Sequence, residues 1–469
     1  MQVQSMFFKQ RASAKLDDAV LQRNMKKAKG KFVDLRARAV AEVDAWEAVR
    51  THAAKLRDRT IANLDAYLVE FERNATRRGA VVHWADDAQE ACAIIVDIAR
   101  RNGVRIATKS KSMVSEEVNL NEALEAAGVK PVETDLGEYI LQLAHEPPSH
   151  IVAPAVHMSK EQVADLFVAA HHKPRLTDIP AMAREAREAL RGPFLNADMG
   201  ISGSNFLIAE TGTTLTVTNE GNADMVTTLP RIHCVITGIE KVIPTLEDFA
   251  TLIRLLPRSA TGQTISNYLT LTTGVKMPGD ADGPEQMHIV LVDAGRTKFV
   301  GTDMQEMLRC IRCGACMNHC PVYQNIGGHA YGWVYPGPMG SILTPTYVGI
   351  ENAGDLPNAA TFCGECAVVC PVKIPLPDLM RKLREKQFAG RLRPFPERAG
   401  IALWSFVARR PALYALLTKV AVRVAAWLGG RERLIHSLPG LDGWTKGRDM
   451  PAPAGRTFRE LYRERGARR

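Results

Sequence analysis

The sequence predicts a chain of several domains, the largest of which is an α/β domain with a parallel or mostly parallel sheet. Three observations lead to this prediction. Strand-like and helix-like segments alternate in the first half of the chain, seven of the nine cysteines lie in two short runs in the second half, and basic residues are concentrated at the C-terminal end. At 469 residues the chain is also too long for one hydrophobic core, so two or three domains are expected.

The first expected element is a continuous helical segment from about 16 to 75, because this stretch has few helix breakers and apolar residues recur among many charges. Alternating segments follow it. Strands are expected at 80–85, 104–109, 130–135 and 150–155, and helices at 86–103, 116–128, 137–144 and 159–172. Ser159 and Gln162 have the spacing of a capping box that starts the last of these helices. Alternation of this kind is typical of a parallel α/β sheet.

From Asn205 the pattern changes to strands joined by turns. Strand-rich segments are expected at 206–221 and 232–243, and the last strand of the domain at 287–295. The segment 321–362 contains seven Gly and five Pro, which predicts a loop rather than regular core. The expected domains are therefore an N-terminal helical lead at 1–75, the α/β domain at 76–300, a cysteine-rich domain at 301–385 and a basic C-terminal segment at 386–469.

The two cysteine runs are the most specific signal: CIRCGACMNHCP at 310–321 and CGECAVVCP at 363–371. The first run has the spacing C-x2-C-x2-C-x3-C-P, in which three thiolates hold one four-iron cluster and the fourth, before proline, ligates a second cluster. On this logic cluster 1 is held by Cys310, Cys313, Cys316 and Cys370, and cluster 2 by Cys320, Cys363 and Cys366. Zinc is the disfavoured alternative, because zinc sites usually come from two separated CxxC pairs.

The second run lacks one cysteine, so two [4Fe-4S] clusters would have seven cysteine ligands in place of eight. The open corner of cluster 2 could be filled by His319, His329, Glu365, a water or a group from a partner. The iron at that corner could also be absent, which would give a [3Fe-4S] cluster. The two remaining cysteines, Cys92 and Cys234, lie in apolar stretches and are expected to be small buried residues.

The start of the chain has no secretory signal, and the clustered cysteines indicate a reducing compartment, so a cytoplasmic protein is expected. No uncharged apolar run of eighteen residues occurs, which predicts no transmembrane helix. From Arg381 to the end, 21 Lys and Arg face 7 Asp and Glu, whereas the rest of the chain has 39 against 44. Because this basic segment contains no nucleic-acid recognition motif, we expect partner proteins or anionic lipid there and not nucleic acid.

Within that segment, residues 411–428 predict an amphipathic helix. Pro411 stands where a first helical residue is favoured, and Gly429 and Gly430 stand where a helix should end. We expect the helix to pack on its own protein, and peripheral contact with a membrane surface or a partner subunit is the alternative.

Four residues of the α/β domain are candidates for a catalytic or binding role. Lys109 and Lys111 lie between a strand and a helix, where a carboxylate or phosphate can be held. Glu210 and His157 could act as base or orienting groups. The alternative is that each is a capping, turn or surface residue. No G-x-G-x-x-G follows a strand, so a bound nicotinamide or a Rossmann-type flavin is not supported.

Over its whole length the sequence resembles the lactate utilization protein B family, the iron–sulfur subunits of a three-part L-lactate-oxidising system in bacteria. The resemblance is carried by both cysteine runs and by the segments TKSKSMVSEEVNLNEAL, VETDLGEYILQLA, PSHIVAPAVH, GISGSNFLIAETGTTLTVTNEGNADM and GGHAYG. It implies the same seven-cysteine pattern, an N-terminal LUD domain related to the ribose-isomerase and CoA-transferase folds, and an alpha-helical ferredoxin-type module with two clusters. It also implies a family-specific C-terminal segment.

The function that follows is an electron-transfer subunit, through which electrons leave as L-lactate is oxidised to pyruvate. Expected partners are the other subunits of the lactate utilization system and an electron acceptor that the sequence does not identify. One alternative is a catalytic subunit with its substrate site in the LUD domain around Lys109, Lys111 and Glu210. Others are a relay for another 2-hydroxy acid oxidase or for a disulfide reductase, and a redox-sensing nucleic-acid binder that rests only on the basic segment.

Overall fold

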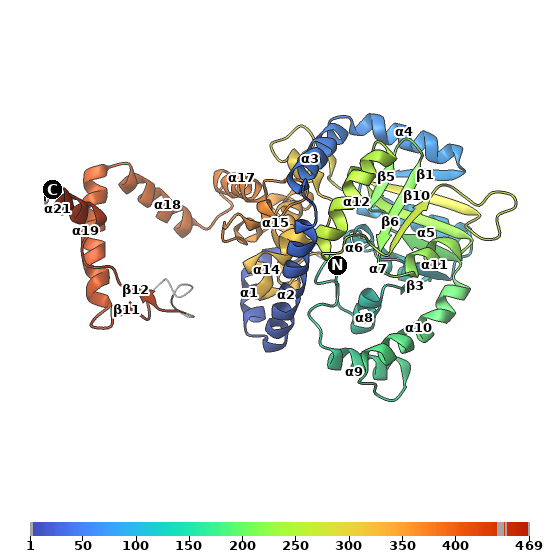
Figure 1. Cartoon of the computed structure of the whole chain (residues 1–469), viewed down its shortest axis with the longest axis horizontal. Coiled ribbons are helices and arrows are strands. Elements are labelled where there is room, and N and C mark those ends of the chain that lie inside the picture. The colour runs from blue at the N-terminus through green and yellow to red at the C-terminus, as the bar shows by residue number, and fades with distance from the viewer. Residues whose placement is uncertain (1–2, 439–444, 446–447, 468–469) are drawn as a thin grey trace. The chain divides into compact units, whose positions relative to one another are not determined.

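A computed structural model describes residues 3–438, 445 and 448–467 (Figure 1). Contacts divide the chain into two units, Met1–Lys386 and Gln387–Arg469. The first unit contains the six-stranded and four-stranded sheets and all seven cysteines of the two runs.

The N-terminal region is helical, but it is not one continuous helix. Its helices are η1 Ser5–Phe7, α1 Phe8–Leu16, α2 Ala19–Ala41, α3 Trp46–Ala62 and α4 Leu64–Arg77. The side chain of Asp18 accepts a hydrogen bond from the Leu21 N–H and starts α2. A second break precedes Trp46, where residues 42–45 form turns. The single helix expected from 16 to 75 is therefore wrong in its continuity, because capping and turn residues inside a charged helical pattern were not recognised as breaks.

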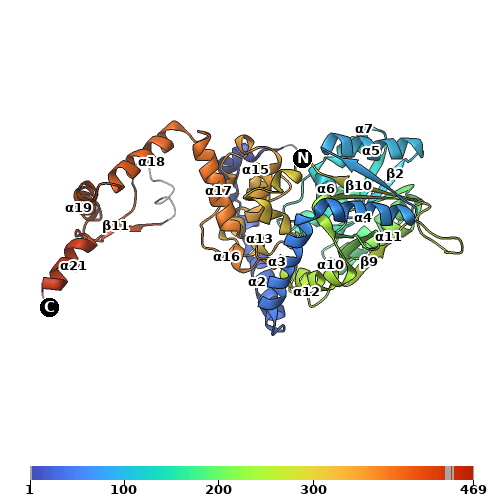
Figure 2. The same cartoon turned by 90° about the horizontal axis from the view of Figure 1, so that it is seen from above.

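The main sheet has six strands in the order β1-β10-β7-β4-β2-β3, and every neighbouring pair is parallel. Its strands are β1 Ala80–Ala85, β2 Ile106–Lys109, β3 Lys130–Glu133, β4 Met199–Ser202, β7 Ile232–Gly238 and β10 Gln286–Val292. Helices α5 Ala88–Arg101 and α7 Leu120–Ala126 cover one face, and α4 covers the other (Figure 2). Strands buried on both faces explain the near-continuous apolar sequence of β7 and β10. The predicted parallel α/β architecture is confirmed.

A second sheet carries the strands expected at 206–221, whereas the segments expected at 232–243 and 287–295 supply β7 and β10 of the main sheet. Its order is β8-β5-β6-β9, with strands β5 Phe206–Ile208, β6 Thr213–Thr218, β8 Val242–Ile243 and β9 Tyr268–Thr272. The remaining helices of the α/β domain are α6 Met113–Glu117, α8 Leu136–Ala144, α9 Lys160–His171, α10 Ile179–Asn196, α11 Asn222–Thr228 and α12 Leu246–Ala260. The Ser159–Gln162 capping box at the start of α9 is present, as predicted.

The strand expected at 150–155 is wrong, because this segment forms turns held by its own side chains. Ser149 Oγ donates to the Pro154 carbonyl, and His150 Nδ1 accepts from the N–H groups of Val152 and Ala153. These local bonds take the place of a strand ladder.

The cysteine-rich region consists of short helices, and the loop expected at 321–362 is wrong in part. Its elements are η4 Gln305–Arg309, α13 Ala315–Asn318, α14 Pro321–Ile326, η5 His329–Tyr331, α15 Gly337–Tyr347, η6 Ile350–Asn352, η7 Leu356–Asn358, α16 Glu365–Val368 and α17 Leu376–Ala389. Most of α15 is buried. A Cβ at Gly340 would collide with the Tyr335 carbonyl oxygen, and one at Gly328 with that of Ser149. The glycines of this segment therefore permit close packing and do not mark a loose loop.

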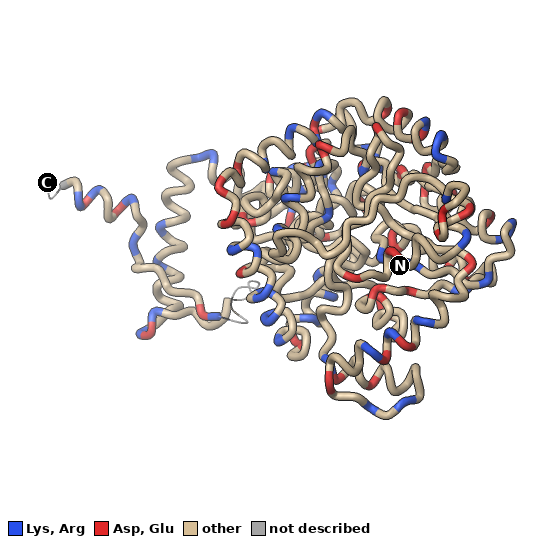
Figure 3. Tube along the Cα trace, turned by 45° about the vertical axis from the view of Figure 1, so that its right-hand side comes forward, with Lys and Arg blue, Asp and Glu red and all other residues tan. Residues whose placement is uncertain are grey.

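The C-terminal unit contains α18 Phe395–Ala408, α19 Pro411–Leu428, β11 Leu434–Ile435, β12 Met450–Pro451 and α21 Phe458–Ala467. Helix α19 has the predicted bounds, and Lys419 forms an ion pair with Glu460 at 3.0 Å. No residue of α19 is buried within the described chain, and the Trp427 side chain is 78% exposed. By length and composition α19 is apolar enough to cross a membrane. The sequence did not predict this, because Lys419 and Arg423 interrupt its apolar run. Figure 3 shows the Lys and Arg residues that recur along this unit.

Candidate functional site

The structure places the four thiols expected for cluster 1 around one small cavity. Cys310, Cys313, Cys316 and Cys370 line it together with apolar residues of the same region. Gly314, with φ of 77°, lets the chain turn between the second and third cysteines. The Cys370 Sγ also accepts a hydrogen bond from the Ile374 N–H at 3.3 Å. Three thiols from one tight turn and a fourth from a distant segment thus lie around one point, as a cubane with four thiolate ligands requires.

The three thiols expected for cluster 2 form a second group. Cys320 and Cys366 are buried, and Cys363 is exposed. Burial, reinforced by nearby Cys320 and Cys363, raises the pKa of the Cys366 thiol to about 12. Bound iron would supply the positive charge that turns such crowded, buried thiols into thiolates. Both groups therefore fit iron–sulfur clusters in their donor chemistry.

Three side chains were candidates for the open corner of cluster 2, and they lie in different surroundings. His319 precedes Cys320, and its Nδ1 contacts the Ala315 carbonyl oxygen at 2.9 Å. Glu365 precedes Cys366 and raises the pKa of His319, although burial lowers that pKa overall. His329 Nε2 donates to the Pro147 carbonyl oxygen at 2.7 Å, so this imidazole is engaged with the loop that follows α8.

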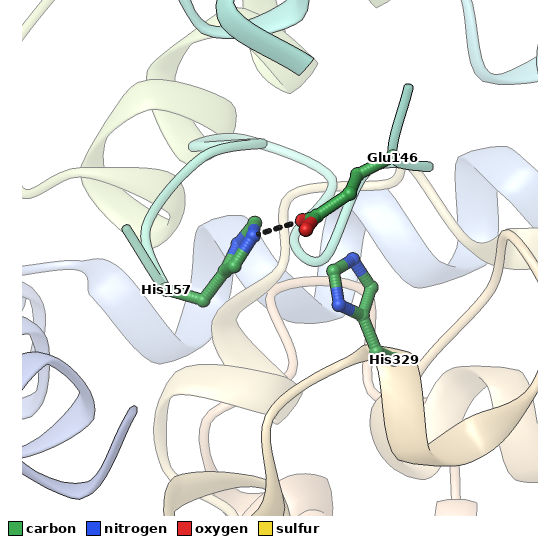
Figure 4. Close-up of side chains that lie close together, drawn as sticks. All are labelled: Glu146, His157 and His329. Atoms are coloured by element: carbon green, nitrogen blue, oxygen red, sulfur yellow. Dashed lines mark hydrogen bonds and ion pairs between the residues drawn. The ribbon is translucent and has the colours of Figure 1, made fainter. Parts of the chain in front are cut away.

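His329 also belongs to a group with Glu146 and His157 (Figure 4). His157 Nε2 lies 2.8 Å from a Glu146 carboxylate oxygen, and its Nδ1 lies 2.8 Å from Ser149 Oγ. Burial lowers the pKa of His329 to about 4 and that of His157 below its usual value, so both imidazoles are neutral at pH 7. One ligand-type atom of each residue lies within 4.8 Å of the others, and two imidazoles with one carboxylate are ligands that a divalent transition metal accepts.

Arginines from the N-terminal helices hold the backbone of the second cysteine run. Arg50 of α3 donates to the carbonyl oxygens of Cys370 at 2.6 Å and Val368 at 2.7 Å. Arg36 of α2 donates to that of Val369 at 2.9 Å. These buried guanidinium groups satisfy the free carbonyls at the end of α16 and place positive charge beside the thiols.

A larger cavity, of about 380 Å³, lies at the carboxyl ends of strands β2, β3, β4 and β7. We call it the LUD cavity. Residues that follow those strands line it, including Ser110, Lys111, Asp135, Ser204 and Lys241, and the cysteine-rich region contributes Arg312, Cys313 and Tyr335. Carboxyl ends of parallel strands are the usual place for a ligand crevice. Here the crevice also reaches a predicted ligand of cluster 1.

Of the four candidate residues in the α/β domain, the LUD cavity takes in only Lys111, whose Nζ donates to the Val152 carbonyl oxygen at 3.0 Å. Lys109 Nζ is buried in an ion pair with Glu133 at 2.6 Å. Glu210 accepts a hydrogen bond from the Leu246 N–H at 2.6 Å, at the start of α12. His157 belongs to the Glu146 group described above. The structure therefore does not bring these four side chains together.

A buried charged network beside the LUD cavity joins the α/β domain to the cysteine-rich region. Arg296 binds both carboxylate oxygens of Glu117 at 2.9 Å and Glu240 at 2.6 Å. Arg312 donates to Glu240 at 3.2 Å, and Tyr335 donates to Glu117 at 2.5 Å. The sequence analysis did not identify Lys241 or Arg312 as site residues. The signals available for them were the position of Lys241 after a strand and that of Arg312 between two cysteines.

Parallel α/β architecture with two cysteine groups defines an iron–sulfur protein with a LUD domain. Residues 68–292 match the family model of the LUD domain, 306–374 that of the 4Fe-4S dicluster domain and 380–467 that of the lactate utilisation protein B C-terminal region. Lactate utilization protein B of Lysinibacillus sphaericus is 43% identical over 98% of this chain and 97% of its own length, and that of Bacillus subtilis is 42% identical over 98% and 96%. The chain belongs to the lactate utilization protein B family, as its sequence indicated.

A solved structure of a DUF162 family protein from Deinococcus radiodurans is also similar. It is 15% identical, with coverage of 49% of this chain and 98% of its own and a TM-score of 0.26. At that TM-score the likeness carries no argument about the fold.

Proposed function

We propose that this chain is the iron–sulfur electron-transfer subunit in the oxidation of L-lactate to pyruvate, which allows lactate to serve as a carbon source. One observation carries the proposal. Cys313, a predicted ligand of cluster 1, lines the LUD cavity, whereas Cys363, a predicted ligand of cluster 2, is exposed. Two [4Fe-4S] clusters held in these positions would connect the LUD cavity to the surface beside Cys363. Membership of the family supports lactate as the source of the electrons.

Oxidation of lactate to pyruvate releases two electrons and two protons, and an iron–sulfur cluster carries electrons one at a time. A group that accepts both electrons must therefore stand between lactate and the clusters, and we assign it to another subunit of the lactate utilization system.

Phe362 and Val368 are exposed at the second cysteine run and provide an apolar surface for the electron acceptor or a subunit.

Several finer features belong to the same proposal. The domain limits are 1–75, 76–300, 301–385 and 386–469, and the LUD domain is related to the ribose-isomerase and CoA-transferase folds. The open corner of cluster 2 is held by a ligand other than cysteine, or else the cluster is [3Fe-4S]. The protein acts in the cytoplasm, with peripheral membrane contact through the basic C-terminal segment as an option.

A catalytic role for this chain is the second candidate function. The LUD cavity favours it, since a crevice beside a predicted cluster ligand could hold the substrate itself. Lys111 lines that crevice, whereas Lys109 and Glu210 are engaged elsewhere.

Electron paramagnetic resonance of the anaerobically prepared chain separates the two functions. For a relay subunit, dithionite reduces the clusters, L-lactate alone does not, and L-lactate does so once the other subunits are added. Reduction by L-lactate of the isolated chain would contradict the relay and place the substrate site in this chain. A three-iron signal in the oxidised sample would show that the open corner has no iron.

A further inference from the structure

We propose that the LUD cavity binds the oxyanion, carboxylate or phosphate, of a small organic ligand, and that Lys241 is its principal partner, assisted by Ser110 and Arg312. The inference rests on the proposed function for its role in lactate oxidation, but the binding itself rests on the cavity.

Lys241 is a buried cation on the wall of the cavity. It ends the turn η2 Ile239–Lys241 after strand β7, is 7% exposed and lines the cavity. Within the described part of the chain its ammonium group has no hydrogen bond and no ion pair, although the nearby Glu240 carboxylate favours its charged form. Burial, with the positive charge of Arg312 nearby, lowers its pKa to about 8. Burying an unpaired ammonium is costly, and an anion in the adjoining cavity would remove that cost.

Ser110 supplies an independent observation on the same wall. It directly follows strand β2, is 2% exposed and lines the cavity. Its hydroxyl group has no hydrogen-bond partner among the described residues. Buried hydroxyl groups are normally hydrogen-bonded, so the Ser110 hydroxyl is left for an oxyanion that reaches this wall of the cavity.

Charged residues of both signs line the cavity. Its cations are Lys111, Lys241 and Arg312, and its acids are Asp135, Glu220 and Glu240. Arg312 donates to Glu240 and Lys111 donates to the Val152 carbonyl oxygen, so among the described residues Lys241 is the lining cation whose ammonium group is left for an anion. Lys241 and Arg312 line the same cavity as Cys313, a predicted ligand of cluster 1, so a ligand that they hold lies close to the cluster.

The rest of the wall suits the carbon body of a small molecule. Phe32, Ile151 and Leu256 give it apolar surface, and Asn205 and Thr218 give it polar groups. A volume of about 380 Å³ lies within the range of small-molecule sites. Both a short 2-hydroxy or 2-oxo acid and a phosphate-bearing flavin provide the required oxyanion.

Calorimetric titration of the cluster-loaded, oxidised full chain tests the proposal, with L-lactate and pyruvate as the carboxylate arm and flavin mononucleotide as the phosphate arm. We expect binding in at least one arm, and the arm that binds identifies the source of the oxyanion. Lys241→Met should weaken that binding about tenfold or more, because a charge-assisted hydrogen bond to a buried group is lost. The matched control is Lys173→Met, which removes an exposed lysine outside the cavity and should leave binding unchanged.

Absence of binding in both arms, or unchanged affinity in Lys241→Met, would overturn the proposal. Iron content and thermal unfolding show whether each variant is intact. If Lys241→Met does not assemble its clusters, Ser110→Ala takes its place, with several-fold weaker binding expected and unchanged affinity contradicting the proposal. Because no electron transfer is involved, failure here is distinct from failure of the relay, which the reduction experiment decides.

Discussion

Glu138 is a buried carboxyl group that the fold leaves without a hydrogen bond. It lies in α8, is 5% exposed, and neither carboxylate oxygen has a partner among the described residues. Burial raises its pKa well above the usual range, although Lys111 nearby opposes the shift. A carboxyl whose folded pKa is raised binds its proton more tightly in the folded state, so folding stability falls as pH rises above the ordinary value near 4.5.

Substitution Glu138→Gln should remove this pH dependence, because the amide does not ionise. We expect the melting temperature of the variant to exceed that of the parent by a margin that grows from pH 4.5 upward, until pH reaches the folded pKa. Calorimetry of both proteins at several pH values measures the margin. A margin that shrinks or stays constant with pH would contradict the ionisation of Glu138 as its cause.

Cysteine substitutions test which thiols share a cluster. Cys320 stands in the first run, but the spacing assigns it to cluster 2 with Cys363. We therefore expect Cys320→Ala and Cys363→Ala to lose the same cluster, and Cys313→Ala and Cys370→Ala to lose the other. Iron analysis should show about half of the parent's iron in each variant, and the resonance spectra should fall into these two pairs. Pairing of Cys320→Ala with Cys313→Ala would contradict the crossover.

Individual residues differed in how far the sequence could place them. Spacing alone grouped the cysteines, because the ligands of one cluster are mostly close in sequence. Lys111 was found from its position after a strand. Lys241 and Arg312 were not, since two chain segments far apart in sequence form their shared surroundings. Lys109 followed the same strand-end pattern as Lys111 but is neutralised by Glu133 from the neighbouring strand.

At the scale of elements, periodicity predicted the parallel sheet correctly because buried strands are short, apolar and bounded by turns. It failed at 150–155, where side chains of the segment bond to its own backbone. It also failed at α15, because Gly and Pro residues, considered one at a time, indicate a loop. Close packing explains these glycines, and only the surroundings of the helix reveal it.

Two glycine substitutions separate close packing from helix propensity. Gly340→Ala in α15 should destabilise the protein by about 1–3 kcal/mol or more, because its Cβ would collide with the backbone of Tyr335, which precedes the helix. Gly30→Ala, inside α2, meets no atom within 4 Å and should stabilise by about 0.5–1 kcal/mol. Thermal unfolding measures both effects, and Gly340→Ala without loss of stability would contradict the packing.

The whole molecule joins parts that the sequence order separates. The sequence predicts residues 1–75 as a separate helical lead. The structure packs these helices against both the sheets and the cysteine-rich region. Arg57 illustrates this, since it donates to the carbonyl oxygens of Val242 at 2.9 Å and Leu308 at 3.0 Å. Long-range packing of this kind has no local sequence signal, so the lead could be predicted as helical but not as part of the core.

Truncations from the two ends should therefore have opposite effects on the clusters. A chain that ends at Lys386 retains all seven cysteines and the unit that surrounds them, and we expect it to keep the iron content and resonance spectrum of the full chain. A chain that begins at residue 63 lacks Arg36, Arg50 and Arg57, whose buried guanidinium groups hold carbonyl oxygens of the second cysteine run and of Leu308. Loss of these charge-assisted hydrogen bonds should prevent stable cluster assembly, which iron analysis after anaerobic purification measures. Full iron content in the chain without residues 1–62 would contradict a supporting role for the lead, and iron loss in the chain ending at Lys386 would make the C-terminal unit necessary for the clusters.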